Sequence, residues 1–144
     1  MKPKRAFWLE TDAPGELLQC MVGFLAHGSY IVFEGDLSRC DFSRVRTLSP
    51  APGPAVKRET DPSEGEQVVL PLEMETQAHI LAQVLTDNRF LDDIAAVQIV
   101  RDGEVLFLAG DHFDVECVSV GGSIPEDFLK ELVQRGVLKS YRKG

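Results

Sequence analysis

The side chains best suited to chemistry lie in one short stretch, Asp111-His112-Phe113-Asp114-Val115-Glu116-Cys117. We expect residues 113–120 to form a strand, and successive side chains of a strand point to opposite faces. His112, Asp114 and Glu116 would then share one face. An imidazole and two carboxylates on one face could bind a divalent cation or share a proton. With Asp111 beside them and Glu104 on the preceding strand, they form the candidate acidic face of this chain.

A simpler interpretation of the same residues is a solvated sheet surface. Residues i and i+2 of one strand have Cα atoms roughly 7 Å apart, so a metal site would need ligands from elsewhere in the fold. An antiparallel sheet with one solvated face carries polar residues there and apolar residues opposite. The stretch is therefore compatible with a cation- or small-ligand-binding site, but its spacing does not require one.

Motifs of the common enzyme classes do not accompany this stretch. The three histidines form no HExxH or HxH pattern, and no Gly-x-Ser-x-Gly turn is present. Gly121 and Gly122 precede an expected helix, but no nucleotide-binding glycine pattern surrounds them, and Glu126 and Asp127 would oppose a phosphate. We therefore expect no cofactor and favour a non-enzymatic protein. An enzyme that uses residues 111–117 is the alternative.

Cysteine use and hydropathy indicate the compartment. The cysteines are odd in number, widely spaced and without CxxC pairing: Cys20, Cys40 and Cys117. They predict reduced thiols in a cytoplasmic protein rather than a disulfide framework or a zinc site. The apolar runs are too short for a membrane-spanning helix or a signal peptide, so we expect no membrane partner.

Charge is distributed unevenly along the chain. Residues 59–131 hold seventeen acids and three bases, a net charge of −14 in a chain whose total is −8. The first 58 residues sum to +2 and the last thirteen to +4. An acidic body of this kind would repel nucleic-acid phosphates and attract a basic protein surface or a cation.

Hydrophobic periodicity and turn residues predict the elements that would position these groups. Asp102-Gly103 between two apolar runs predicts a hairpin, and Ser123 with Glu126 predicts a capping box. Pro71 places its strand at an edge or a strand end. We expect strands at 6–10, 29–33, 39–48, 67–72, 95–100, 104–109 and 113–120, and helices at 14–27, 74–86 and 124–135.

Residues 49–66 interrupt this pattern. The segment holds four prolines, two glycines and many charges, with few apolar residues to pack, so we expect a flexible loop. The pattern of the remaining residues predicts that the chain, residues 1–144, forms a single α+β domain that contains this loop. It has six or seven strands in a mainly antiparallel or mixed sheet with three helices packed on it. Gly28 to Asp36 also resembles Gly103 to Asp111, which leaves an internal duplication open.

These features favour a small acidic interaction protein that binds a basic protein partner, as inhibitors and regulatory proteins do. The alternative is a ligand- or cation-binding domain or enzyme at the acidic face. A homodimer through an edge strand, 39–48 or 67–72, is a third possibility.

Overall fold

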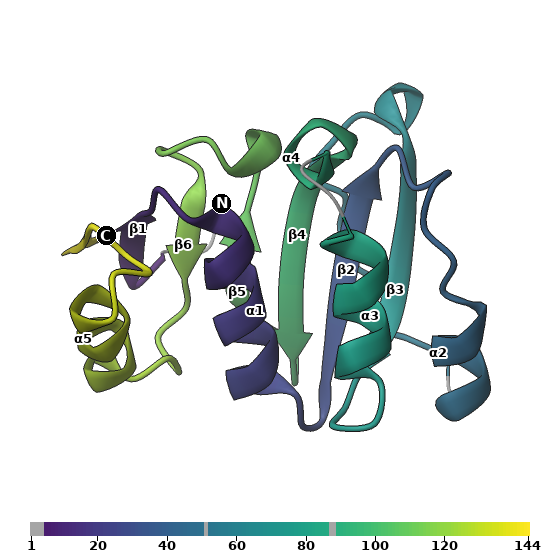
Figure 1. Cartoon of the computed structure of the whole chain (residues 1–144), viewed down its shortest axis with the longest axis horizontal. Coiled ribbons are helices and arrows are strands. Elements are labelled where there is room, and N and C mark those ends of the chain that lie inside the picture. Colours follow the sequence, from purple (N-terminus) through teal and green to yellow (C-terminus); the bar gives the residue numbers. More distant parts are fainter. Residues whose placement is uncertain (1–4, 51, 87–88) are drawn as a thin grey trace.

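A seven-stranded sheet forms the centre of the computed structural model, which describes residues 5–50, 52–86 and 89–144 (Figure 1). The strand order is β3-β2-β4-β5-β6-β1-β7, and every neighbouring pair is antiparallel. This confirms the predicted α+β class. The strands are β1 (Phe7–Glu10), β2 (Ser29–Gly35), β3 (Glu66–Leu72), β4 (Ile94–Arg101), β5 (Glu104–Ala109), β6 (Val118–Val120) and β7 (Ser140–Lys143).

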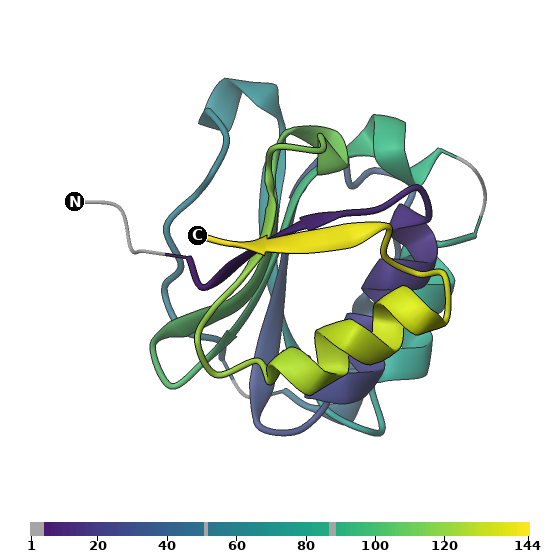
Figure 2. The same ribbon diagram turned by 90° about the vertical axis from the view of Figure 1, so that its left-hand side faces the viewer.

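Helices cover one face of this sheet. In Figure 2 the longer helices α1 (Pro14–Leu25), α3 (Gln77–Val84) and α5 (Glu126–Gln134) all lie on the same side. The shorter elements are α2 (Ser43–Leu48), α4 (Phe90–Asp93) and the 3₁₀ turns η1 (Pro62–Glu64) and η2 (Asp111–Phe113). None of the described helices combines the length and the hydropathy of a membrane span.

The hydrophobic core fills the space between these helices and the sheet. Ile31 and Phe33 of β2 are fully buried against it, as are Leu17, Leu18 and Met21 of α1. Fully burying one such side chain stabilises the folded state by about 1.5–3 kcal/mol. This layer therefore holds the helices on the sheet.

The opposite face carries the alternate side chains, and one row of them crosses every strand. In register order from β3 to β7 this row is Val69, Val32, Gln98, Leu108, Ser119, Trp8 and Arg142. In the described part of the chain this face is covered by residues 52–61, here called the strap, and not by a helix (Figure 2). The strap belongs to the segment predicted to be flexible. Its mobility stays a prediction.

Local signals of short range predict several elements correctly. Asp102 and Gly103 form the two-residue hairpin turn between β4 and β5, with φ values of 50° and 80°. Two positive φ values are what a type I′ hairpin requires. Helix α1 begins at Pro14, as predicted, and β3 lies at a sheet edge. The duplication stays a hypothesis.

One predicted strand is wrong, a second is shortened, and the predicted cap of the last helix is wrong. Residues 39–48 are not a strand, because Phe42 and Val45 are both buried three residues apart and the chain forms helix α2. The strand predicted for 113–120 is shortened to β6 by the turn η2. Helix α5 begins at Glu126 with Pro125 as its N-cap, and its N-terminus has no side-chain cap. The structure also adds α4 and the polar edge strand β7, which were not predicted.

A close backbone contact at the end of β2 depends on glycine. Gly35 has a φ of 136°, and a Cβ there would lie 2.2 Å from the carbonyl oxygen of Asp93. A register irregularity between Glu34 and Gly35 occurs at the same point. The backbone at the end of β2 therefore lies in close contact with the end of α4, directly before β4. Acidic side chains gather at the same place.

Candidate functional site

The structure separates the residues of the predicted acidic face. Asp111 and His112 lie in η2, while Asp114 and Glu116 lie in the loop before β6, so the predicted alternation along one strand is wrong. Glu104 begins β5, and Asp111 follows the other end of that strand. At 3.4 Å per residue, the length of β5 alone places the two ends roughly 17 Å apart.

Glu104 has a structural role of its own at the far end of the sheet. Its Oε1 accepts a hydrogen bond from the hydroxyl of Ser123 at 2.7 Å, and its Oε2 accepts one from the Ser123 amide at 3.2 Å. Ser123 is the residue predicted to cap helix α5. The hydroxyl therefore holds the β6–α5 loop against β5 instead of capping the helix.

The loop from Gly110 to Cys117 is closed by its own backbone. The Gly110 amide donates to the Cys117 carbonyl at 2.9 Å, and the Cys117 amide donates to the Asp114 carbonyl at 2.8 Å. Asp111, His112 and Phe113 have φ values of 43°, 56° and 63°. Left-handed backbone costs roughly 1–2 kcal/mol for a residue with a side chain, so other contacts must hold this turn in place.

Side chains on both sides of the turn provide these contacts. Phe113 is buried, with its ring centroid 5.7 Å from that of Phe90 and 6.4 Å from that of Phe107. Nδ1 of His112 lies 2.6 Å from the Leu91 carbonyl oxygen. A carbonyl only accepts, so Nδ1 is the donor of this contact. The turn is thus attached to α4.

Asp111→Gly is expected to raise the free energy of unfolding by about 1 kcal/mol, because glycine adopts positive φ without the clash that a Cβ meets. Asp114→Gly is the matched control. It removes the same charge at a φ of −51°, and it also loses the carboxylate that accepts from the Glu116 amide at 3.0 Å. Urea unfolding should show a gain for the first variant and a loss for the second. A loss for both would contradict the strain assigned to this turn.

Seven carboxylates from four segments line one pocket of about 520 Å³ at this end of the sheet. We call this group the acidic end. Its members are Asp36 after β2, Glu59, Asp61 and Glu64 from the strap and η1, Asp92 and Asp93 from α4, and Asp111 from η2. His112 also lines the pocket, and the described residues that line it include no lysine or arginine.

Local hydrogen bonds lower the pKa of two of these carboxylates, Asp36 and Asp61. Oδ1 of Asp36 accepts from the hydroxyl of Ser38 at 2.6 Å and from its amide at 3.1 Å. Asp61 and Ser63 repeat this arrangement at 2.8 and 2.9 Å. The Ser38 hydroxyl, followed by its amide, lowers the pKa of Asp36, and the Ser63 amide, followed by its hydroxyl, lowers the pKa of Asp61. Both side chains therefore present negative charge at neutral pH.

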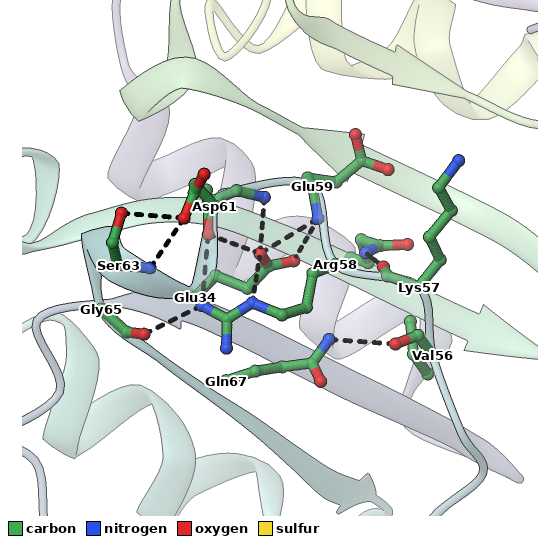
Figure 3. A network of polar contacts seen from close by, with 11 residues as sticks. Glu34, Val56, Lys57, Arg58, Glu59, Asp61, Ser63, Gly65 and Gln67 are labelled. Atoms are coloured by element: carbon green, nitrogen blue, oxygen red, sulfur yellow. Dashed lines mark hydrogen bonds and ion pairs between the residues drawn. The ribbon is translucent and has the colours of Figure 1, made fainter.

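A buried carboxylate holds the strap at the acidic end (Figure 3). Glu34 of β2 is fully buried and accepts hydrogen bonds from the Glu59 amide at 2.9 and 3.0 Å. The amide and the hydroxyl of Thr60 donate to the same carboxylate at 2.9 and 2.8 Å. Nε of Arg58 lies 3.9 Å from Glu34 Oε1, which is an ion pair rather than a hydrogen bond. Glu34 thereby positions Glu59 and the residues that follow it.

Two further contacts attach the strap to the sheet. The side-chain amide of Gln67 donates to the Val56 carbonyl at 3.1 Å, and that of Gln98 donates to the Lys57 carbonyl at 3.1 Å (Figure 3). Gln98 is buried in β4 and Gln67 lies in β3. The strap is therefore held by polar side chains of three neighbouring strands.

Positive charge borders the acidic end. Nη1 of Arg39 lies 3.5 Å from Asp93 Oδ2, and Arg89 acts on Asp36 through its charge. A cysteine nucleophile is not favoured here, because burial and then the carboxylates of Asp114 and Asp111 raise the pKa of Cys117. The described residues include no group of three or more His, Cys, Asp or Glu side chains arranged to hold a metal ion.

Of the predicted site residues, the structure brings only Asp111 and His112 into this pocket, with Asp114 and Glu116 in the same loop. The other six carboxylates were not predicted. One local signal could have found two of them, since Asp36-Leu37-Ser38 and Asp61-Pro62-Ser63 share an Asp-x-Ser pattern that is typical of Asx turns. The meeting of the four segments depends on long-range strand pairing.

Comparisons with protein-family models, with curated proteins and with solved structures found no match.

Proposed function

We propose that this protein is a non-enzymatic interaction module that binds a basic protein surface through its acidic end. The observation that supports this most directly is the convergence of seven carboxylates on one pocket. Ionised carboxylates accept charge-assisted hydrogen bonds from lysine and arginine, and arginine can donate two parallel bonds to one carboxylate.

The surroundings of the pocket favour a protein rather than a free cation as the partner. Val115 is 54% exposed between Asp114 and Glu116, so the loop that follows the pocket residue His112 also presents an apolar side chain. Protein interfaces combine apolar contact with a charged rim, whereas a hard cation needs oxygen ligands alone. The turns at Asp36 and Asp61 already hold their carboxylates in place, so less conformational entropy is lost when a partner binds.

Electrostatics determine which partners the acidic end would accept. A positive surface would be steered towards it, and complementary charge increases the association rate more than the final affinity. Nucleic-acid phosphates and anionic surfaces would be repelled. The free thiols Cys20, Cys40 and Cys117 fit a reducing compartment, so we place this interaction in the cytoplasm.

Affinity capture at two salt concentrations tests the proposal. The full chain is immobilised and exposed to a lysate at about 50 mM salt, and bound proteins are eluted at about 500 mM, where the Debye length falls well below 10 Å. The expected result is a basic protein that elutes with salt and rebinds when purified. If captured proteins are acidic, or stay bound at high salt, recognition through the acidic end is wrong.

A further inference from the structure

A second pocket, of about 960 Å³, is lined by residues of the strap and of the sheet. Figure 2 shows the strap on the side of the sheet that the helices leave open. Leu108, Val100 and Val105 contribute apolar side chains from the sheet, and Ala55 and Val56 contribute them from the strap. Its volume is at the upper end of the range of roughly 300–1,000 Å³ that small-molecule sites occupy. Most of its lining is apolar, and Glu59 is the one residue that it shares with the lining of the acidic end.

The pocket is elongated across the sheet, with one large aromatic residue near each end. Trp8 lies on β1 and Tyr30 on β2, and both line the pocket. Three strands separate β1 from β2 in the sheet order. At about 4.8 Å between neighbouring strands, the two residues are roughly 19 Å apart. A long, narrow ligand fits this outline better than a compact one.

A buried cation lies at the Trp8 end of this pocket. Arg5 is only 9% exposed, and its Nε donates to the Ser119 hydroxyl at 2.9 Å while Nη1 donates to the Val105 carbonyl at 2.8 Å. Its remaining nitrogen, Nη2, is buried and has no hydrogen-bond partner in the described residues. Within the same residues, no carboxylate forms an ion pair with Arg5. The carboxylates of Glu104 and Glu59 act on Arg5 only through their charge, without a direct contact.

No other charged side chain that lines the pocket forms an ion pair with Arg5 in the described residues. Glu59 and Asp102 line the pocket but are exposed, whereas Arg101 is half-buried and bound to neutral acceptors, the Ser29 hydroxyl and the Leu25 carbonyl. The pocket is therefore lined by two guanidinium groups that are at least half-buried, although the chain is acidic. Desolvation lowers the pKa of Arg5, yet a guanidinium remains protonated in proteins. An anion would relieve the cost of an unpaired buried charge.

We infer that this pocket binds an elongated amphipathic monocarboxylate. Its carboxylate pairs with Arg5, and its apolar body lies along Leu108 and Val100 towards Tyr30, beneath the strap. A carboxylate suits a guanidinium because it can accept two parallel hydrogen bonds, and Nη2 has none at present. The two sites share only Glu59 among their lining residues, and this inference does not rest on the binding proposed for the acidic end.

The only tryptophan of the chain provides the test, because Trp8 lines the pocket. The full-length protein is titrated with sodium decanoate and, in parallel, with decan-1-ol, which has the same alkyl chain and no charge, both below their aggregation concentrations. Trp8 fluorescence and calorimetry should show saturable binding of decanoate. Decanol should bind about tenfold more weakly or worse, since a hydrogen bond to a charged group contributes about 1.5–3 kcal/mol.

Arg5→Met and Lys130→Met form a matched pair of variants, because each removes one positive charge and Lys130 is exposed on α5, away from the pocket lining. Decanoate affinity should fall about tenfold in the Arg5 variant and stay unchanged in the Lys130 variant. Melting temperatures check that both variants fold. Three results would overturn the inference: no saturable decanoate binding to the wild type, equal affinity for decanol, or undiminished decanoate binding by folded Arg5→Met. The comparison of decanoate with decanol uses the wild-type protein, so it tests the inference even if Arg5→Met does not fold.

Discussion

Glu34→Ala is expected to lower the free energy of unfolding by about 3 kcal/mol and to release the strap. The substitution leaves the Glu59 amide, the Thr60 amide and the Thr60 hydroxyl without their acceptor. It also leaves the half-buried guanidinium of Arg58 without its counter-charge. Removing one partner of a buried charge pair typically costs about 3–5 kcal/mol. Urea unfolding monitored by circular dichroism measures the change.

Limited proteolysis reports on the strap separately, because trypsin cleaves after Lys57 and Arg58 within it. We expect slow cleavage at these bonds in the wild type and rapid cleavage in Glu34→Ala. Glu66→Ala on the neighbouring strand is the control, since Glu66 is exposed and should leave both stability and cleavage unchanged. Equally rapid cleavage of wild type and Glu34→Ala would show that Glu34 does not hold the strap, and would favour the flexible loop that the composition predicts.

Removing three charges from the acidic end is expected to reduce the association rate with a basic partner about tenfold at low salt, since steering depends on local charge. The variant combines Asp61→Asn, Glu64→Gln and Asp92→Asn. Asparagine keeps an oxygen that can accept from Ser63, so the turn at Asp61 is preserved. Surface plasmon resonance at several ionic strengths measures the rate.

A control with the same net charge separates local from overall electrostatics. Glu75→Gln, Asp127→Asn and Glu131→Gln remove three exposed carboxylates that do not line the acidic pocket. Both triple variants change the net charge from −8 to −5. The control should keep nearly the wild-type association rate. If the two variants slow association equally, the interaction depends on total charge and not on the acidic end.

Elements specified by neighbouring residues were the ones that the sequence predicted well. The Asp102-Gly103 hairpin and the start of α1 at Pro14 both depend on backbone preferences within a few residues. Strand β7 was not predicted, because Ser140-Tyr141-Arg142-Lys143 is a polar sequence that becomes a strand only by pairing with β1. Tertiary pairing of this kind overrides local propensity.

The site was predicted less well than the fold, and for a physical reason. Alternation of polar and apolar residues over 112–117 has a period of two, which predicts a strand. The chain instead turns through three left-handed residues, held by the burial of Phe113 against Phe90 and Phe107. Those partners lie on other elements, so no local pattern reports the turn. Only Asp111 and His112 of the predicted face reach the pocket.

Mapping the contact surface by NMR is the most direct test of binding at the acidic end. The ¹⁵N-labelled full chain is titrated with the captured basic partner, and amide shifts are followed residue by residue. We predict that the largest shifts occur at residues 36, 59–64, 92–93 and 111–116, and that they diminish in high salt. Shifts confined to the helical face or to strand β7, with the acidic end unchanged, would contradict the proposed function.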